Sequence, residues 1–177
     1  NGFDTDEVPI SSVTNGVHVP TWIDPRMEAL AVDRSQPDLR ARWRAVAEVP
    51  DEQLWRVRAE MRADLVADVR RRLRASWKQR GAADAELSWT DSVLDPEVLT
   101  IGFARRVSTY KRLTLMLRDP QRLRSILLNE ERPVQFIIAG KAHPHDMGGK
   151  KLMQEIVRFA DDAGLRDRFL FLPDYDI

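Results

Sequence analysis

The sequence predicts an α/β fold: a Rossmann-like parallel sheet with flanking helices. Three apolar runs in the second half of the chain are too short for helices and are typical of buried strands: VLTIGFA at 98–104, VQFIIAG at 134–140 and RFLFLPD at 168–174. The segments between them carry apolar residues at helical spacing. Alternating strands and helices with short connections imply parallel pairing and right-handed crossovers, which is half of a Rossmann-like sheet.

Composition limits the class of protein. The chain has 177 residues, 43% of them hydrophobic, which suits one soluble globular unit with its own core. Lys and Arg together number 28, as do Asp and Glu, so a general nucleic-acid binder is disfavoured and any anion site must be local. The absence of cysteine excludes disulfides and thiolate metal sites and is compatible with a reducing cytoplasm. No apolar run approaches the roughly 20 residues of a membrane span, and no secretory leader is seen. We therefore expect a cytoplasmic protein without a membrane partner.

Two regions precede the predicted sheet. Residues 1–24 are rich in Gly, Pro, Asn, Ser and Thr, and they predict an ordered loop with one short extended piece. Residues 25–97 are predicted as a helical segment, in which a short helix follows Pro25 and a long helix runs from Asp51 to just before Gly81. Apolar residues recur every three or four positions along the long helix, which makes it amphipathic: Leu54, Val57, Met61, Leu65, Val69, Leu73 and Trp77. A loop is expected between this helix and the first strand.

Residues 98–177 are predicted as a βαβαβ core that continues beyond the chain. After the first strand, residues 109–129 show helical spacing, and Pro120 is expected to break this helix into two pieces. The Gly148–Gly149 pair is expected to precede the second helix and Gly164 to end it.

The two ends of the sequence suggest an internal piece of a longer protein. The chain opens at Asn1 without a methionine and stops just after the third apolar run. Half of a parallel sheet would expose an edge and an apolar face, so self-association would be unsurprising.

A basic turn follows the first predicted strand. The stretch FARRVSTYKR, residues 103–112, places four cations around a Ser-Thr-Tyr turn: Arg105, Arg106, Lys111 and Arg112. Ligands of open α/β sheets bind beyond the carboxyl ends of the strands, where a helix start also favours an anion. We expect Ser108 or Thr109 to cap the helix while Arg106 and Lys111 converge on an anion. The alternative is a solvated basic loop whose charges pair with acidic neighbours.

The second strand-to-helix connection, IIAGKAHPHD, gives a weaker indication of a ligand site. Gly140 would permit a tight turn, and Lys141 would add charge at the same edge of the sheet. His143 and His145 invite a metal hypothesis, but two histidines flanking a proline are more typical of a solvated loop. No catalytic Ser-His-Asp set, Walker-type loop or dinucleotide fingerprint is visible.

Four stretches, taken together, resemble the α-glucan phosphorylases, the glycogen and maltodextrin phosphorylase family, in its short bacterial form. They are SSVTNGVHVPTW at 11–22, TIGFARRVSTYKR at 100–112, PVQFIIAGKAHP at 133–144 and FLFLPDYD at 169–176, in the order and approximate spacing of the family. The resemblance implies an internal fragment of the C-terminal domain of a two-domain, GT-B-type glycosyltransferase. It implies a retaining enzyme of glycogen degradation that uses inorganic phosphate to release glucose 1-phosphate from α-1,4-glucan. The implied cofactor is pyridoxal 5′-phosphate, used through its phosphate group.

The resemblance also implies roles for residues of the basic turn. Arg106 and Lys111 match the arginine and lysine that hold the substrate phosphate beside the cofactor phosphate. They are therefore the expected catalytic residues, with Arg106 also binding substrate and Lys111 also contacting the cofactor. Arg105 stands where many relatives have a lysine near the cofactor phosphate. Such fixed charge is most useful where negative charge collects in a transition state.

The resemblance assigns three further residues outside that turn. Asn15 would hydrogen-bond the glucosyl unit, while Trp22 and Tyr175 would help form the cofactor pocket. The resemblance further implies that the lysine that binds the cofactor covalently lies downstream of this chain, and that an N-terminal domain outside it closes the other side of the cleft. We therefore expect the isolated 177 residues to be inactive and to hold no covalent cofactor.

Two alternatives remain open from the sequence. A glycogen or starch synthase-type glycosyltransferase would share the fold and place a comparable arginine and lysine against the diphosphate of a nucleotide sugar. A non-catalytic module could retain the same fold. The TNGVHVPTW and FLPDYD stretches favour the phosphorylase.

Overall fold

The computed structural model describes residues 11–31, 33 and 35–173. The chain divides into two compact units, residues 1–57 and 58–177, which are described separately. None of the helices in the described ranges is long and apolar enough to cross a membrane.

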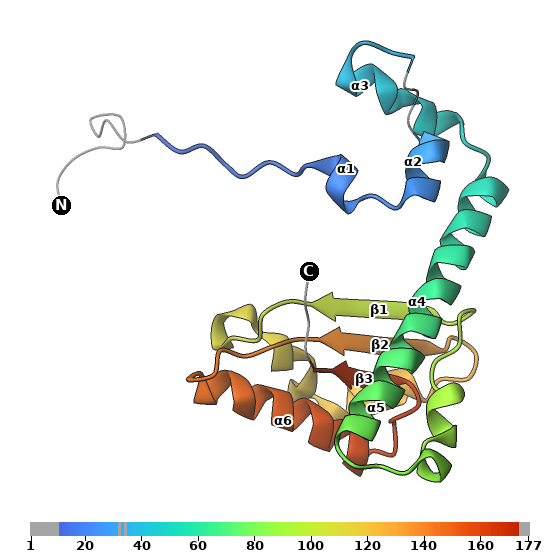
Figure 1. Ribbon diagram of the computed structural model, residues 1–177. Helices are drawn as coiled ribbons and strands as arrows, with labels where there is room; N and C mark the ends of the chain where they lie inside the picture. Colours follow the sequence, from blue (N-terminus) through green and yellow to red (C-terminus); the bar gives the residue numbers. More distant parts are fainter. Residues whose placement is uncertain (1–10, 32, 34, 174–177) are drawn as a thin grey trace. The chain divides into compact units, whose positions relative to one another are not determined.

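The first unit is built from short helical pieces (Figure 1). They are α1 (Val19–Trp22), α2 (Pro25–Ala31), α3 (Leu39–Arg42) and the 3-10 turn η2 (Arg44–Glu48). The predicted helix after Pro25 is confirmed as α2. The loop expected before α2 contains one helical turn, α1. Pro20 lies in the first turn of α1, where a proline costs no hydrogen bond.

The long helix α4 (Asp51–Gln79) confirms the predicted start and end. Asp51 and Glu52 lie in its first turn and Lys78 in its last, so the charges complement the helix dipole. Its later turns bury Val66, Val69 and Leu73 in the second unit. The loop that follows is wound into two 3-10 turns, η3 (Asp84–Glu86) and η4 (Ser88–Asp91).

The second unit contains a three-stranded sheet in the order β1-β2-β3 (Figure 1). The strands are β1 (Leu99–Ala104), β2 (Val134–Ala139) and β3 (Phe169–Leu172), and both pairs are parallel, as predicted. Ile101, Phe136 and Phe169 lie in register across the three strands. Two helices connect the strands, α5 (Pro120–Leu127) and α6 (Met147–Asp162).

Helices cover both faces of the sheet, which gives this unit two cores. On one face, Ile138 and Phe169 pack with residues of α5 and α6 such as Leu127 and Ile156. On the other face, the neighbouring strand positions Ile137 and Leu170 pack against α4. This alternation follows from the two-residue period of a strand, and both faces of β2 and β3 are therefore apolar.

The first strand differs from the prediction, since β1 is not buried. Leu99 is 62% exposed and Ile101 is 41% exposed. The reason is strand order. In the described sheet β1 lies at an edge, and the core on the face toward α5 and α6, to which Leu99 and Ile101 belong, takes only the partly buried Phe103 from β1.

The segment after β1 also differs from the prediction. Residues 109–118 form two 3-10 turns, η5 (Thr109–Lys111) and η6 (Leu113–Arg118), instead of an α-helix. Arg112 separates them in the left-handed conformation, with φ of 52°, which no continuous helix can accommodate. Pro120 does not break a helix: it begins α5, which Asp119 caps by accepting a hydrogen bond from Arg122 N–H.

The second connecting helix begins earlier than expected. Gly148 and Gly149 lie within the first turn of α6, and the carboxylate of Asp146 caps the helix by accepting a hydrogen bond from Gly149 N–H at 2.8 Å. Gly164, with φ of 64°, confirms the predicted end.

Candidate anion site at the carboxyl edge of the sheet

The two strand-to-helix connections lie at one edge of the sheet. Parallel β1 and β2 end at Ala104 and Ala139, which are paired in register, so their arrowheads in Figure 1 point the same way. The segment after β1, residues 105–112, is named the basic loop. This is the edge at which open α/β sheets bind ligands.

The start of the basic loop is fixed by backbone hydrogen bonds. Arg105 N–H donates to the carbonyl of Ala139 at 3.2 Å, and Val107 N–H donates to the carbonyl of Lys141 at 3.0 Å. The loop thus prolongs the pairing of β1 with the chain beyond β2. Val107 is 2% exposed, so a buried side chain anchors the loop directly after the exposed Arg106.

The predicted side-chain cap at the start of the helix after β1 is wrong. The residue before η5 is Ser108, whose side chain makes no capping hydrogen bond. Its Oγ is buried and has no hydrogen-bond partner among the described residues. Because η5 is a three-residue 3-10 turn, closed by Lys111 N–H donating to Ser108 carbonyl at 3.0 Å, it supplies no α-helix dipole. The side chains of the basic loop therefore act on an anion without a helix dipole from η5.

The cations of the basic loop are not neutralised by described carboxylates. Within residues 11–31, 33 and 35–173, none of the four makes an ion pair: Arg105, Arg106, Lys111 and Arg112. The ammonium of Lys111 lies 4.6 Å from the ring centroid of Tyr110, a cation–π contact that does not neutralise its charge. The observation disfavours a loop whose charges pair with acidic neighbours.

The predicted site residues fall into three groups. Arg105, Arg106 and Lys111 share the basic loop. Asn15 and Trp22 belong to the other compact unit, where Asn15 is exposed and Trp22, at the end of α1, is 62% exposed. Tyr175 lies outside the described residues.

The histidines of the second connection are not part of a larger ligand cluster among the described residues. Among the residues that the structure describes, no group of three potential ligands is found. His145 N–H donates to Nδ1 of His143 at 3.2 Å, and both side chains are exposed. The interpretation as a solvated loop is the better supported one.

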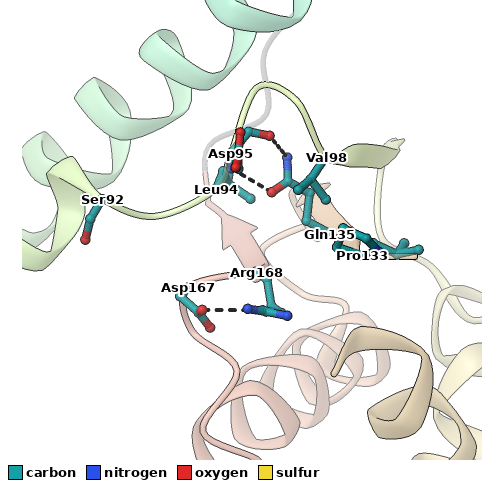
Figure 2. A pocket seen from close by; sticks show the side chains of 9 residues that line it. Ser92, Leu94, Asp95, Val98, Pro133, Gln135, Asp167 and Arg168 are labelled. Carbon is teal, nitrogen blue, oxygen red and sulfur yellow. Dashed lines mark hydrogen bonds and ion pairs between the residues drawn. The ribbon is translucent and has the colours of Figure 1, made fainter. Parts of the chain in front are cut away.

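A pocket of about 190 Å³ lies at the opposite edge of the sheet, at the amino ends of the strands (Figure 2). Its lining includes the amide of Gln135, which is hydrogen-bonded to both backbone groups of Asp95. The amide of Gln135 is thus already engaged within the protein, and the pocket lies away from the edge where open α/β sheets bind ligands.

Two residues important to the basic loop were missed by the sequence analysis. Val107 is the buried anchor, and Gly149 lies against its carbonyl. Neither has a sequence signal, because the approach of α6 to the loop is a tertiary contact.

The fold, and the cations that have no acidic partner among the described residues, define a class: an α/β protein with a candidate anion site at the edge of a parallel sheet. Comparison with known proteins is more specific. The chain is 57% identical over 99% of its length to a glycogen phosphorylase of Mycobacterium tuberculosis. It is 40% identical over 98% of its length to a glycogen phosphorylase of Aquifex aeolicus, and 33% identical over its full length to a maltodextrin phosphorylase of Thermococcus litoralis.

These matches confirm the resemblance: nearly the whole chain is similar to a part of the glycogen and maltodextrin phosphorylases. It spans 21%, 26% and 21%, respectively, of the lengths of these three relatives. No family model matches the chain, and no solved structure matches it.

Proposed function

We propose that this chain is part of an α-glucan phosphorylase of the GT-B type, which releases glucose 1-phosphate from α-1,4-glucan with inorganic phosphate. The observation that carries the proposal is the basic loop, whose cations have no described acidic partner, in a chain related throughout to phosphorylases. Arg106 binds the phosphate through its guanidinium, and Lys111, the last residue of η5, adds a compact charge.

The same residues fit a cofactor that carries a phosphate group. Arg105 and Lys111 are cations without a described carboxylate partner, which is the chemistry that pyridoxal 5′-phosphate requires of its phosphate pocket. When bound, the cofactor would supply a phosphate group beside the substrate phosphate. The basic loop would then hold two crowded anions and stabilise the negative charge that gathers between them in the transition state. Asn15 would hydrogen-bond the glucosyl unit, and Trp22 and Tyr175 would border the cofactor.

The isolated 177 residues are expected to lack activity and covalent cofactor. The chain spans only about a fifth of its relatives, and the lysine that holds the cofactor lies, in this proposal, elsewhere in the full-length protein. Phosphorolysis by the isolated chain would overturn this part of the proposal.

The test uses the full-length protein with a maltodextrin and inorganic phosphate, and measures glucose 1-phosphate. Lys111→Ala should lower kcat/KM for phosphate by about 100-fold or more, because it removes a fixed charge at the developing anion. Lys151→Ala is the control, since Lys151 is an exposed lysine of α6 outside the basic loop. It should leave the rate unchanged.

A synthase-type glycosyltransferase is the second candidate, because a diphosphate would suit the same loop. Glucan extension from a nucleotide sugar, without phosphorolysis, would establish it. The absence of both activities would favour a non-catalytic module.

A further inference from the structure

The basic loop rests on two glycines that have no room for a side chain. A Cβ on Gly140 would lie 2.5 Å from Cγ2 of Val107 and 3.2 Å from the carbonyl oxygen of Arg105. A Cβ on Gly149 would lie 2.8 Å from the carbonyl oxygen of Val107 and 2.9 Å from Oδ2 of Asp146. Both glycines are buried, and neither has a positive φ. Close approach of the loop, and not an unusual backbone conformation, is therefore what makes glycine necessary there.

The lack of room for a side chain is not common to the glycines of this chain. A Cβ on Gly16, Gly81, Gly102 or Gly164 would meet nothing within 4 Å. The two glycines that the basic loop approaches most closely lie on different elements, since Gly140 follows β2 and Gly149 lies in the first turn of α6. Together they form a cradle under one residue of the loop.

Val107 is consequently held on three sides. Its N–H donates to the carbonyl of Lys141, its side chain lies over Gly140, and its carbonyl lies over Gly149. It immediately follows Arg106 in the chain. It precedes Ser108, whose carbonyl accepts the hydrogen bond from Lys111 N–H that closes η5. A displacement of Val107 would therefore move both cations of the proposed phosphate site.

We propose that Gly140 and Gly149 are positioning residues: they set the depth at which Val107 sits and so aim Arg106 and Lys111 at the phosphate. The inference rests on the proposed function for its substrate, but the placement of the loop can be tested without it. An added methyl group at either glycine lifts the loop from the sheet edge. Misplacement of binding groups by about 1 Å can cost on the order of 100-fold in rate.

Gly148 provides a matched control. It is the neighbour of Gly149 in the same helical turn, but its Cβ would meet only Asp146 Oδ1 at 3.3 Å and Thr109 Cγ2 at 3.4 Å. Alanine favours the helix at both positions to a similar degree. Thr109 also belongs to the basic loop, but at 3.4 Å it would be in ordinary van der Waals contact. A difference between Gly149→Ala and Gly148→Ala therefore reports the close approach to the carbonyl of Val107 and not helix propensity.

The first readout is the steady-state kinetics of the full-length protein. Gly149→Ala should lower kcat/KM for inorganic phosphate by about 10- to 100-fold while leaving KM for the glucan within about twofold. Gly148→Ala should stay within about twofold of wild type in both. Equal effects of the two variants on phosphate would overturn the proposal, as would an equal rise in both KM values for Gly149→Ala.

A compensating substitution tests the stated contacts directly. Val107→Ala removes the Cγ2 atom that a Cβ on Gly140 would strike, so Gly140→Ala/Val107→Ala should recover most of the activity lost in Gly140→Ala. The same substitution should not rescue Gly149→Ala, whose clash is with a backbone carbonyl. Rescue of both variants, or of neither, would contradict the proposed contacts of Val107 with Gly140 and Gly149.

The second readout does not depend on activity. Hydrogen exchange of a peptide covering residues 105–112 in the full-length protein should be faster in Gly149→Ala than in wild type, and unchanged in Gly148→Ala. If the wild-type protein shows no phosphorolysis, the proposed function fails, and this measurement still tests the role of the glycines. Unchanged exchange in Gly149→Ala would overturn that role.

Discussion

Gln135 shows how a single buried side chain ties a loop to the sheet. This residue of β2 is 2% exposed, and its amide is satisfied at both ends. Its Oε1 accepts from Asp95 N–H at 2.8 Å, and its Nε2 donates to the carbonyl of Asp95 at 2.8 Å (Figure 2). Its Nε2 also donates to the hydroxyl of Thr100 at 2.7 Å. The loop that enters β1 is therefore fastened to the neighbouring strand by one amide.

Replacing Gln135 with leucine should lower the free energy of unfolding of the chain by about 1–3 kcal/mol, because both backbone groups of Asp95 lose their partner. Thr100→Val is the control: it removes one of these bonds and leaves Asp95 paired, so it should cost about 1 kcal/mol or less. Urea unfolding of the 177-residue chain measures both. A loss for Thr100→Val as large as that for Gln135→Leu would refute the argument.

At the level of the elements, α4 holds the loop that follows it through an arginine. Arg70 Nε donates to the carbonyl of Val93 at 2.9 Å, and its Nη2 donates to the carbonyl of Leu94 at 2.8 Å. Leu94 has φ of 60° and is 5% exposed, so a buried leucine occupies the left-handed region. That conformation costs roughly 1–2 kcal/mol, which the two charged hydrogen bonds and the burial offset.

Arg70→Lys should therefore lower the free energy of unfolding by about 1–3 kcal/mol, since an ammonium cannot reach two carbonyls with the fork geometry of a guanidinium. Arg71→Lys, on an exposed position of the same helix, should change it by less than about 0.5 kcal/mol. Both are measured by urea unfolding. Similar values for the two variants would mean that the guanidinium does not hold the loop.

The turn η3 is joined to α4 by an ion pair that should depend on pH. Asp84 lies 2.7 Å from Lys78 Nζ and 2.9 Å from Arg74 Nη2, and the hydrogen bond from Lys78 is the main cause that lowers the pKa of Asp84 from 3.8. A lowered pKa in the folded state means that the carboxylate stabilises the fold above its unfolded pKa and loses this effect as the pH falls below 3.8. Asp84→Asn should thus lower the thermal midpoint near neutral pH, and the difference should shrink on acidification. Glu97→Gln, which removes an exposed carboxylate without a described ion pair, should show no such trend.

At the level of the whole molecule, the sequence predicts those features of the fold that depend on short-range patterns of residues. The ends of α4 follow from Asp51 and Gly81, and the parallel sheet follows from the alternation of strands and helices. The exposure of β1 could not be predicted, because it depends on which strands are neighbours. The left-handed Arg112, which replaces a helix by two 3-10 turns, has no signal in an ordinary apolar spacing.

The candidate site was likewise predicted in part. The cations of the site could be predicted from the position of FARRVSTYKR after a strand. The residues that support the basic loop could not be predicted. Gly149 is about 40 residues away from Val107 in sequence, and only the packing of α6 brings the two together. Asn15 and Trp22 belong to a separate unit, so their part in the site remains a proposal about the full-length protein.

Two isoleucines on the same face of the sheet test how its layers are built. Ile101 and Ile138 both lie on the face toward α5 and α6, since Ile101 is in register with Phe136 and Phe136 precedes Ile138 by two positions. Ile138 is 0% exposed and lies within the core, whereas Ile101 is 41% exposed. Ile138→Ala should cost about 2–5 kcal/mol in the free energy of unfolding, because it leaves a cavity between two layers.

Ile101→Ala in the 177-residue chain should cost about 1 kcal/mol or less, since its side chain leaves much of its surface in water even when folded. Urea unfolding of both variants gives the comparison, and the same chemical change at both positions removes any difference in β propensity. Equal losses would mean that β1 is covered as fully as β2. A small loss at Ile101 beside a large one at Ile138 would establish that the core of this unit is centred on β2 and β3, with β1 and its basic loop at the edge.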